Sequence, residues 1–311
     1  MGFLFDIKGQ LSTIRLADSN ALWPLFEAVV NSIQSIEDSP NKDCGKIVIH
    51  AHRKTSNQFG LESKEPLGRF ESFSITDNGI GLDAENYRSF NTAYSTLKVQ
   101  KGCKGIGRFL WLKAFDSVKI KSVFAEDKSF FCREFTFTSD GIAPEDNQAE
   151  TSVQELSTTI RLSNFHTNYQ NAAPVELEAV AKRIIEHCLP FFISEKCPEI
   201  ILLDDESAPI KLNQYYAENV KDSLHQDRFT LNDVDFTIYH LRLPEGFSGH
   251  ELHLCANMQE VRSVELKKYI PNLQKKIIPN DDSGGFFYVG YIVSGYLDSR
   301  VNTTRTDFDF D

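Results

Sequence analysis

The sequence predicts an α/β protein of two domains, residues 1–215 and 216–311. The first part combines apolar residues at helical spacing with short alternating strands. The second part is mainly strand-like, in a ββαβ order, with strands expected at Phe229 to Leu243, Glu251 to Asn257 and Phe286 to Leu297 and a helix near Val264 to Lys276. The chain has 311 residues, of which 41% are hydrophobic and 25% charged, so it is long enough to bury two cores of ordinary size.

The segment from Asn20 to Ile36 has the periodicity of an amphipathic helix. At ~100° per residue its apolar side chains gather on one side, and Glu27, Asn31, Gln34 and Ser35 gather on the other. Glu27 and Asn31 are therefore one helical turn apart. Such a polar stripe is typical of a solvated face, and it equally suits a site that needs a carboxylate beside an amide.

A strand and a tight turn are predicted next. Residues 73–76 alternate like a strand with one buried face, and they lead into Asp77-Asn78-Gly79, a turn sequence. Asp77 can accept a hydrogen bond from an exocyclic amine, and Gly79 and Gly81 leave space for a flat base against the backbone. An ordinary Asn-Gly turn between two elements explains the same residues.

A glycine-rich loop, Gly102 to Gly107, precedes an apolar helix candidate, Phe109 to Phe115. Amide groups at a helix N-terminus that glycines leave open can bind phosphate. The spacing fits neither the Walker A loop nor the dinucleotide fingerprint. A flexible loop without a ligand is the alternative. Residues 175–187 and 200–203 complete the first domain as an amphipathic helix and a buried strand.

The helix with Glu27 and Asn31, the turn after Asp77 and the glycine-rich loop, together with Thr158 to Leu162, closely resemble the four motifs of the GHKL superfamily. This superfamily includes gyrase B subunits, Hsp90 chaperones, sensor histidine kinases, MutL repair proteins and MORC ATPases. The order and distances agree through the first ~200 residues. The resemblance implies a Bergerat-type ATP-binding domain with a mixed, mostly antiparallel sheet covered by helices. It also implies that a smaller, transducer-like α/β domain follows.

The resemblance assigns roles to matching residues. Glu27 is expected to be the general base that polarises the attacking water, and Asn31 the protein ligand to Mg²⁺. Asp77 is expected to bind the adenine amine, with Thr158 supporting it. Many family members have Asp where this chain has Gln34, so a role for that carboxylate is altered or absent here.

The remaining expected ATP contacts come from the glycines and from a mobile lid. Gly79 and Gly81 would line the base. Residues 91–101 have the composition of the family's ATP lid, whose Ser95 and Lys98 would reach the nucleotide unless the loop is simply solvated. The phosphates would be held by Gly102, Lys104, Gly105, Ile106 and Gly107.

In the transducer-containing relatives a cation from the second domain reaches the γ-phosphate. Arg305, in a segment similar to the Hsp90 stretch with its catalytic arginine, is the first candidate here. Lys267, Lys268, Lys275 and Lys276 form the second group, although a basic helix face explains them as well. Arg300 is the third candidate.

We therefore expect a Mg²⁺-dependent ATPase that dimerises with itself when ATP binds and controls a partner protein, a nucleic acid or a C-terminal effector, in prokaryotic phage defence or DNA metabolism. A sensor-kinase phosphotransferase would need a phosphoacceptor helix before the motifs, and only 26 residues precede Glu27. A switch that binds ATP without hydrolysing it is the other alternative.

Global properties add several exclusions. The formal charge of −11 argues against a simple DNA clamp, which would display a basic surface. No run approaches ~18 apolar residues and the N-terminus lacks a signal-peptide profile, so we expect a cytoplasmic protein without a membrane partner. The six cysteines are expected to be reduced, and none of the eight histidines is spaced as a metal pair. Residues 305–311 resemble an interrupted strand, as in a fragment of a longer protein.

Overall fold

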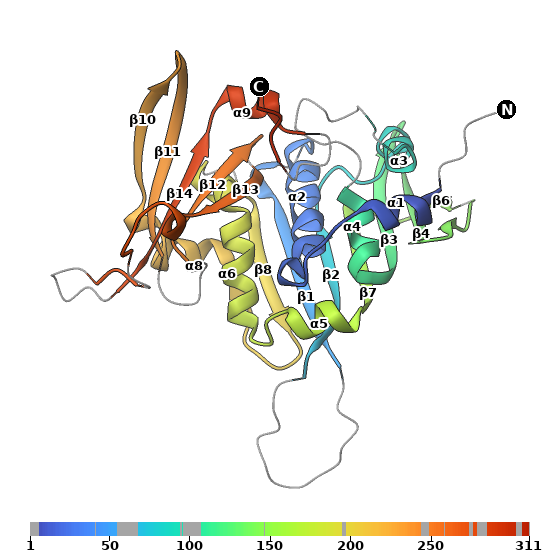
Figure 1. The fold of residues 1–311 in the computed structure, drawn as a ribbon. Helices are drawn as coiled ribbons and strands as arrows, with labels where there is room; N and C mark the ends of the chain where they lie inside the picture. Colours follow the sequence, from blue (N-terminus) through green and yellow to red (C-terminus); the bar gives the residue numbers. More distant parts are fainter. Residues whose placement is uncertain are drawn as a thin grey trace, which may run out of the picture. The chain divides into compact units, whose positions relative to one another are not determined.

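The computed structural model describes residues 6–40, 42–54, 68–93, 95, 107–145, 147–194, 197–243, 249–257, 259–273, 276–278, 285–302 and 307–310. These residues form two compact units, each with its own β-sheet (Figure 1). The first unit contains the described residues up to 95 together with 107–180 and 198–211, and the second contains those of 181–197 and 212–310. The predicted α/β class, with mixed sheets covered by helices, is confirmed.

The sheet of the first unit has nine strands in the described residues. The strand order is β5-β4-β3-β7-β2-β1-β8-β9, with β6 paired to β4. Every pair is antiparallel except β1 with β8, which is parallel. The strands are β1 (Lys46–Arg53), β2 (Phe70–Asp77), β3 (Phe115–Glu126), β4 (Ser129–Thr138), β5 (Gly141–Ala143), β6 (Gln148–Glu150), β7 (Ser157–Phe165), β8 (Glu199–Asp204) and β9 (Ile210–Lys211).

Helix α2 (Trp23–Glu37) lies across one face of this sheet, against β1, β2 and β7, and beside α4 (Gly107–Ala114) (Figure 1). Its apolar stripe is buried, which confirms the predicted amphipathic helix. The helix begins after a 3-10 turn (Asp18–Asn20), and Pro24 falls in its first turn, where no amide donor is needed. The other helices that lie wholly or mostly in this unit are α1 (Ile7–Thr13), α3 (Ala84–Asn91), α5 (Thr167–Ala172) and the first part of α6 (Leu177–His187).

The opposite face of the central strands is polar. Strand register places His50 of β1 beside Ser74 of β2, Ser74 beside Arg161 of β7, and Arg161 beside Lys119 of β3. Because side chains alternate along a strand, the apolar neighbours of these residues point to the other face and pack under α2. The sheet of the first unit therefore has one face that packs in the core and one face that carries polar groups.

The second unit contains a five-stranded sheet in the order β10-β11-β14-β12-β13, in which β12 and β14 are parallel. Its strands are β10 (His225–Leu231), β11 (Val234–Leu243), β12 (Glu251–Ala256), β13 (Gln259–Glu265) and β14 (Phe287–Val293). Its helices are α7 (Leu189–Ile193), α8 (Leu212–Asn219) and α9 (Gly295–Arg300), with the last part of α6. A small core of Ala256, Val261, Leu297 and Phe308 lies beside the sheet.

The helix predicted near Val264 to Lys276 is wrong over its described residues. Strand β13 continues to Glu265, where it pairs with β12, and only a 3-10 turn at Leu266–Lys268 follows. Pro271 disfavours a helix there, and Asn272 has a φ of 65°, outside the helical region. Pairing with a neighbouring strand and these two residues therefore override the helical pattern.

Three other boundaries differ from the sequence prediction. Residues 229–243 form a hairpin and not one strand, because Asn232 and Asp233 both have positive φ, as a two-residue turn requires. The predicted strand from Phe286 to Leu297 ends at Val293, where Ser294 caps α9. The polar stretch at residues 140–151, which the sequence predicts to be a surface insertion, contributes the edge strands β5 and β6. No helix in the described parts of the chain has the length and apolar character needed to cross a bilayer.

Candidate functional site

Three polar residues of α2, spaced four residues apart, connect two parts of the candidate ATP site. Glu27, Asn31 and Ser35 fall on one stripe of the helix, because residues four apart lie on the same face. Glu27 lies next to Gly107 at one end of the stripe, and Ser35 lies next to Gly79 at the other. Asn31, which is half-buried, is one turn from each.

The carboxylate of Glu27 lies at the first residue of α4. A methyl group added to Gly107 would be 3.1 Å from Glu27 Cδ and closer still to Oε2. No other residue contributes to the three nearest contacts at that position. The predicted base and the last glycine of the predicted phosphate loop are therefore neighbours, although 80 positions separate them in the sequence.

Asp77 is the last residue of β2 and its side chain is buried, with 3% of the residue exposed. Its Oδ2 accepts a hydrogen bond of 2.8 Å from the Ser32 hydroxyl, and its Oδ1 accepts one of 2.9 Å from the Gly79 amide. The first bond comes from α2 and the second from the turn that follows β2. The carboxylate orientation is thus fixed by donors from two elements.

The turn after Asp77 is attached to α2 by its backbone. The Ile80 amide donates to the Ser35 carbonyl at 3.1 Å. A methyl group on Gly79 would lie 2.7 Å from the Ser35 carbonyl carbon, and Gly81 has a φ of +82°. Only glycine fits these two positions without a shift of the backbone. The glycines are therefore explained by packing and conformation, whether or not a ligand is bound.

Thr158 lies opposite Asp77 in the β2–β7 ladder and is also buried. Its hydroxyl is 2.9 Å from the Ser122 hydroxyl, which in turn accepts a 2.8 Å bond from the Leu82 amide. Thr158 is therefore linked through Ser122 to the segment that follows Gly81. The sequence analysis missed Ser122, although a serine in the same alternating set as the apolar residues Val118, Ile120 and Phe124 of β3 was a usable signal.

Several predicted contacts lie outside the described residues, namely Lys98, Gly102, Lys104, Gly105, Ile106, Lys275 and Arg305. Ser95 is described, and its hydroxyl is 2.6 Å from that of Ser89 in α3. Among the alternative cations of the second unit, Lys267 and Lys268 lie in the 3-10 turn after β13, and the Arg300 guanidinium lies 5.5 Å from the Tyr296 ring centroid. Gln34 is only 3% exposed.

Arg108, the second residue of α4, is buried among aromatic rings. Its guanidinium carbon lies 5.2 Å from the Phe90 ring centroid and 5.0 Å from that of Phe109. Burial lowers the pKa of Arg108 to about 10, so the side chain keeps its charge at neutral pH. Arg108 thus brings a buried positive charge to the N-terminal turn of α4. It directly follows Gly107, the residue that lies next to the Glu27 carboxylate.

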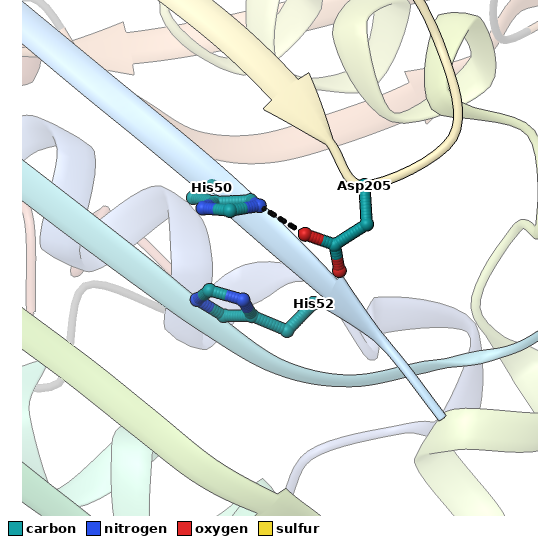
Figure 2. A group of neighbouring side chains, drawn as sticks. All are labelled: His50, His52 and Asp205. Carbon is teal, nitrogen blue, oxygen red and sulfur yellow. Dashed lines mark hydrogen bonds and ion pairs between the residues drawn. The ribbon is translucent and has the colours of Figure 1, made fainter. Parts of the chain in front are cut away.

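A second polar group, of two histidines and an aspartate, was missed by the sequence analysis, which found no histidines spaced as a metal pair with another ligand. His50 and His52 project from the same face of β1, and Asp205, just after β8, joins them (Figure 2). The signal was available, because histidines two apart in a strand share a face. Residues 46–53 alternate in this way along β1.

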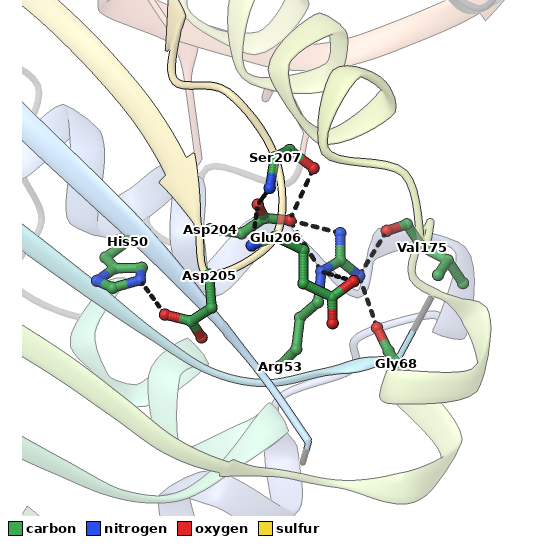
Figure 3. Close-up of polar contacts among 8 residues, drawn as sticks. All are labelled: His50, Arg53, Gly68, Val175, Asp204, Asp205, Glu206 and Ser207. Carbon is green, nitrogen blue, oxygen red and sulfur yellow. Dashed lines mark hydrogen bonds and ion pairs between the residues drawn. The ribbon is translucent and has the colours of Figure 1, made fainter. Parts of the chain in front are cut away.

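Beside this group, Arg53 of β1 and Asp204 of β8 form a buried ion pair (Figure 3). The Arg53 Nε and Nη2 atoms donate to Asp204 Oδ2 at 2.8 and 2.6 Å. Nη1 donates to the carbonyls of Gly68 and Val175 at 2.6 and 3.0 Å. This network connects four segments of the first unit.

No model of a known protein family matches this chain, and no curated protein matches its sequence.

Proposed function

We propose that this protein binds ATP with Mg²⁺ and hydrolyses it in the manner of the GHKL ATPases that its motifs resemble. The observation that carries the proposal is the position of the Glu27 carboxylate against Gly107, at the N-terminus of α4. A helix N-terminus favours phosphate oxygens, and a carboxylate beside it can accept a proton from an attacking water. General base and phosphate site would then share one pocket.

The Asp77 carboxylate supports the adenine end of the proposal. A carboxylate held by Ser32 and Gly79 keeps one orientation, which is what recognition of a planar amine requires. Gly79 has no side chain and lies in close contact with Ser35, so Gly79 itself would not cover a base lying beside the turn. Gly81, Thr158 and Ser122 would form the adjoining wall of the proposed adenine pocket.

Asn31 fits the role of magnesium ligand by its chemistry and by its place on α2, between Glu27 at the proposed phosphate site and Ser35 beside the Asp77 turn. Mg²⁺ takes oxygen ligands and usually few from the protein, with phosphates and waters completing its shell. When bound, the ion would neutralise charge on the triphosphate. The task of Glu27 is to orient the water and receive its proton. Arg305 of the second unit is the proposed cation for the γ-phosphate.

By the same resemblance, we propose that ATP binding promotes self-association and thereby controls a partner or effector. This part rests on the resemblance alone. It is tested by size-exclusion chromatography with light scattering, with and without a non-hydrolysable ATP analogue. A nucleotide-dependent doubling of mass is expected, and an unchanged mass would remove this part of the proposal.

The central test follows the fate of γ-labelled ATP with the full chain and Mg²⁺. Free phosphate is expected from the wild type, and Glu27→Ala should lower its release by about 10²- to 10⁴-fold while ATP binding, measured by calorimetry, persists. Glu37→Ala is the matched control, since Glu37 lies in the same helix but is exposed. It should hydrolyse ATP at the wild-type rate.

Each other outcome contradicts a defined part of the proposal. Labelled protein in place of free phosphate would indicate a phosphotransferase. Binding without release of phosphate would indicate a nucleotide switch. No affinity for ATP would overturn the assignment of the pocket.

A further inference from the structure

The group formed by His50, His52 and Asp205 lies on the open, polar face of the first sheet, on the opposite face from α2. The two imidazole rings are 4.0 Å apart between centroids, and His50 Nε2 is 2.9 Å from Asp205 Oδ1. One ligand atom from each of the three residues lies within 4.8 Å of the others (Figure 2). No other group of three such side chains in the described parts of the chain meets this condition.

The geometry of strand β1 alone brings the two histidines together, and no loop is needed to place them. His50 and His52 are two apart in β1, and side chains two apart point to the same face. Strand β8 runs parallel to β1, with Asp204 beside Ala51. Asp205, the next residue, therefore leaves the sheet next to the pair of histidines.

The neighbouring ion pair fixes the backbone that carries Asp205. Asp204 turns away from the histidines to Arg53, and its Oδ1 accepts hydrogen bonds from the amides of Glu206 and Ser207 at 3.1 and 2.6 Å (Figure 3). The turn after β8 is thus closed around one carboxylate. The next carboxylate, that of Asp205, is held towards His50, which is the preorganisation that a metal site needs.

His52 also has a partner of the kind found behind metal-ligating imidazoles. Its Nε2 is 2.9 Å from the Ser74 hydroxyl, which leaves Nδ1 as the ring nitrogen for a metal.

We propose that His50, His52 and Asp205 bind a divalent transition metal of the Zn²⁺ class. Two imidazole nitrogens and one carboxylate oxygen are a common zinc ligand set, and water completes the tetrahedron. Nitrogen donors favour such a metal over Mg²⁺ or Ca²⁺, which take oxygen ligands. The metal would clamp β1 to the turn after β8. This site is separate from the proposed ATP pocket and does not depend on it.

The test is calorimetric titration of the full, tag-free chain with Zn²⁺ in the absence of nucleotide. One metal ion per chain is expected, with a rise in melting temperature. His50→Ala and His52→Ala should each weaken binding by more than about 100-fold, because even an outer-shell partner is typically worth about 10- to 100-fold. With Co²⁺ in place of Zn²⁺, visible absorption bands of a tetrahedral site should appear, and they should be lost in both variants.

His166→Ala is the matched control. His166 also contacts one aspartate, Asp116, at 2.9 Å, and its side chain is 35% exposed, against 33% for His50. It should bind Zn²⁺ like the wild type, as should Glu27→Ala, which disables only the proposed ATPase. Circular dichroism of each variant without metal establishes that it is folded.

Two results would overturn the proposal. The first is an absence of stoichiometric binding to the wild type. The second is binding that survives both histidine substitutions, because the metal would then lie elsewhere. Should a folded His50→Ala protein not be obtained, Asp205→Asn serves the same purpose, since Asp205 is exposed and its loss removes a ligand without emptying the sheet face.

Discussion

Asp77 and Asp204 both end a strand of the same sheet, yet their environments differ in kind. Each is the last residue of a strand, β2 or β8, and each is buried, with 3% and 7% exposed. Asp204 is paired with the Arg53 guanidinium and with two backbone amides. Asp77 accepts from a hydroxyl and an amide, which are neutral donors.

The difference teaches that burial of a strand-terminal aspartate does not by itself indicate a ligand site. A buried charge needs compensation, and the type of donor shows what the side chain is for. An arginine that also binds two carbonyls makes Asp204 part of the structure. A hydroxyl and an amide fix the orientation of the Asp77 carboxylate, as the proposed recognition of an adenine amine requires.

The largest effect on stability is expected from Asp204→Asn. It would leave the Arg53 charge buried beside a neutral amide, and breaking a buried pair in this way costs about 3–5 kcal/mol. Urea unfolding of wild type and variant measures the difference. Glu206→Gln is the matched control, since Glu206 lies 4.0 Å from Arg53 Nε but is half-exposed, and it should cost less than about 1 kcal/mol. Equal losses in both would remove the special role of Asp204.

The same pair predicts a dependence on pH. Burial alone would raise the pKa of Asp204, but the amides of Ser207 and Glu206 and the Arg53 guanidinium outweigh it and lower the pKa. The stabilisation is therefore fully present above the unfolded value of about 3.9 and is lost as the pH falls through the lowered folded value. This acid-dependent part of the unfolding free energy should disappear in Asp204→Asn.

Asp77→Asn should show the opposite balance. Its effect on unfolding is expected to be about 1 kcal/mol, because the donors Ser32 and Gly79 that hold Asp77 are neutral. ATP affinity, in contrast, should fall by about 10- to 100-fold, as expected for a lost hydrogen bond to a charged group. Calorimetry and urea unfolding of the same preparation measure both quantities. A loss of stability as large as that of Asp204→Asn would abolish the contrast between the two aspartates.

A third buried charge, in the second unit, extends the comparison. His253 Nδ1 lies 3.0 Å from Glu260, and the imidazole stacks on Tyr291 at 4.6 Å between centroids. Burial opposes the charge, but Glu260, followed by Glu186 and Glu251, raises the pKa of His253 above its usual value. Burial likewise opposes the charge of Glu260, while His253 lowers the pKa of that carboxyl.

The sign of the resulting pH dependence differs from that of Asp204. The stabilisation from protonated His253 is fully present below the unfolded value of about 6.5 and is lost as the pH rises through the raised folded value. Urea unfolding from neutral to alkaline pH should show this decline in the wild type, and His253→Gln should flatten it. A decline that persists unchanged in the variant would assign it to another group.

The contrast also explains what could be predicted from the sequence. Helix α2, strands β2 and β8, and helix α6 follow from local periodicity, and the glycines around Asp77 mark its turn. Asp204 stands in a run, Asp-Asp-Glu, that reads as a solvated surface, and its partner Arg53 lies 151 positions away. No local pattern reports such a pairing. The His50–His52 pair is different, because histidines two apart in a strand share a face, so a local signal for it was present in the sequence although the sequence analysis missed it.

The same distinction between local signals and interactions of distant residues holds for the predicted elements that were wrong. The helix expected near Val264 to Lys276 is wrong in part because β13 pairs with β12 as far as Glu265, a tertiary interaction that the local pattern does not contain. Pro271, in contrast, was a local signal against a helix. The hairpin at Asn232-Asp233, in contrast, could have been recognised from its turn residues. In the candidate ATP site, the contact of Glu27 with Gly107 depends on how α2 and α4 pack, which the motif order alone does not determine.

The smallest effect on stability, combined with a large effect on activity, is expected from Gly107→Ala. The added methyl would meet only the end of the Glu27 side chain, which is flexible, and alanine favours a helix over glycine by up to about 1 kcal/mol. The protein should therefore fold with unchanged or slightly higher stability. The Glu27 carboxylate, however, must move from the N-terminus of α4, and ATP hydrolysis should fall by at least about tenfold, because a base displaced by even 1 Å loses its alignment with the water. Gly295→Ala is the matched control, since Gly295 also begins a helix, α9, and an added methyl meets nothing within 4 Å. Phosphate release and thermal unfolding of both variants decide the matter: a Gly107→Ala protein that hydrolyses ATP normally would show that the position of Glu27 at this helix end has no part in the reaction.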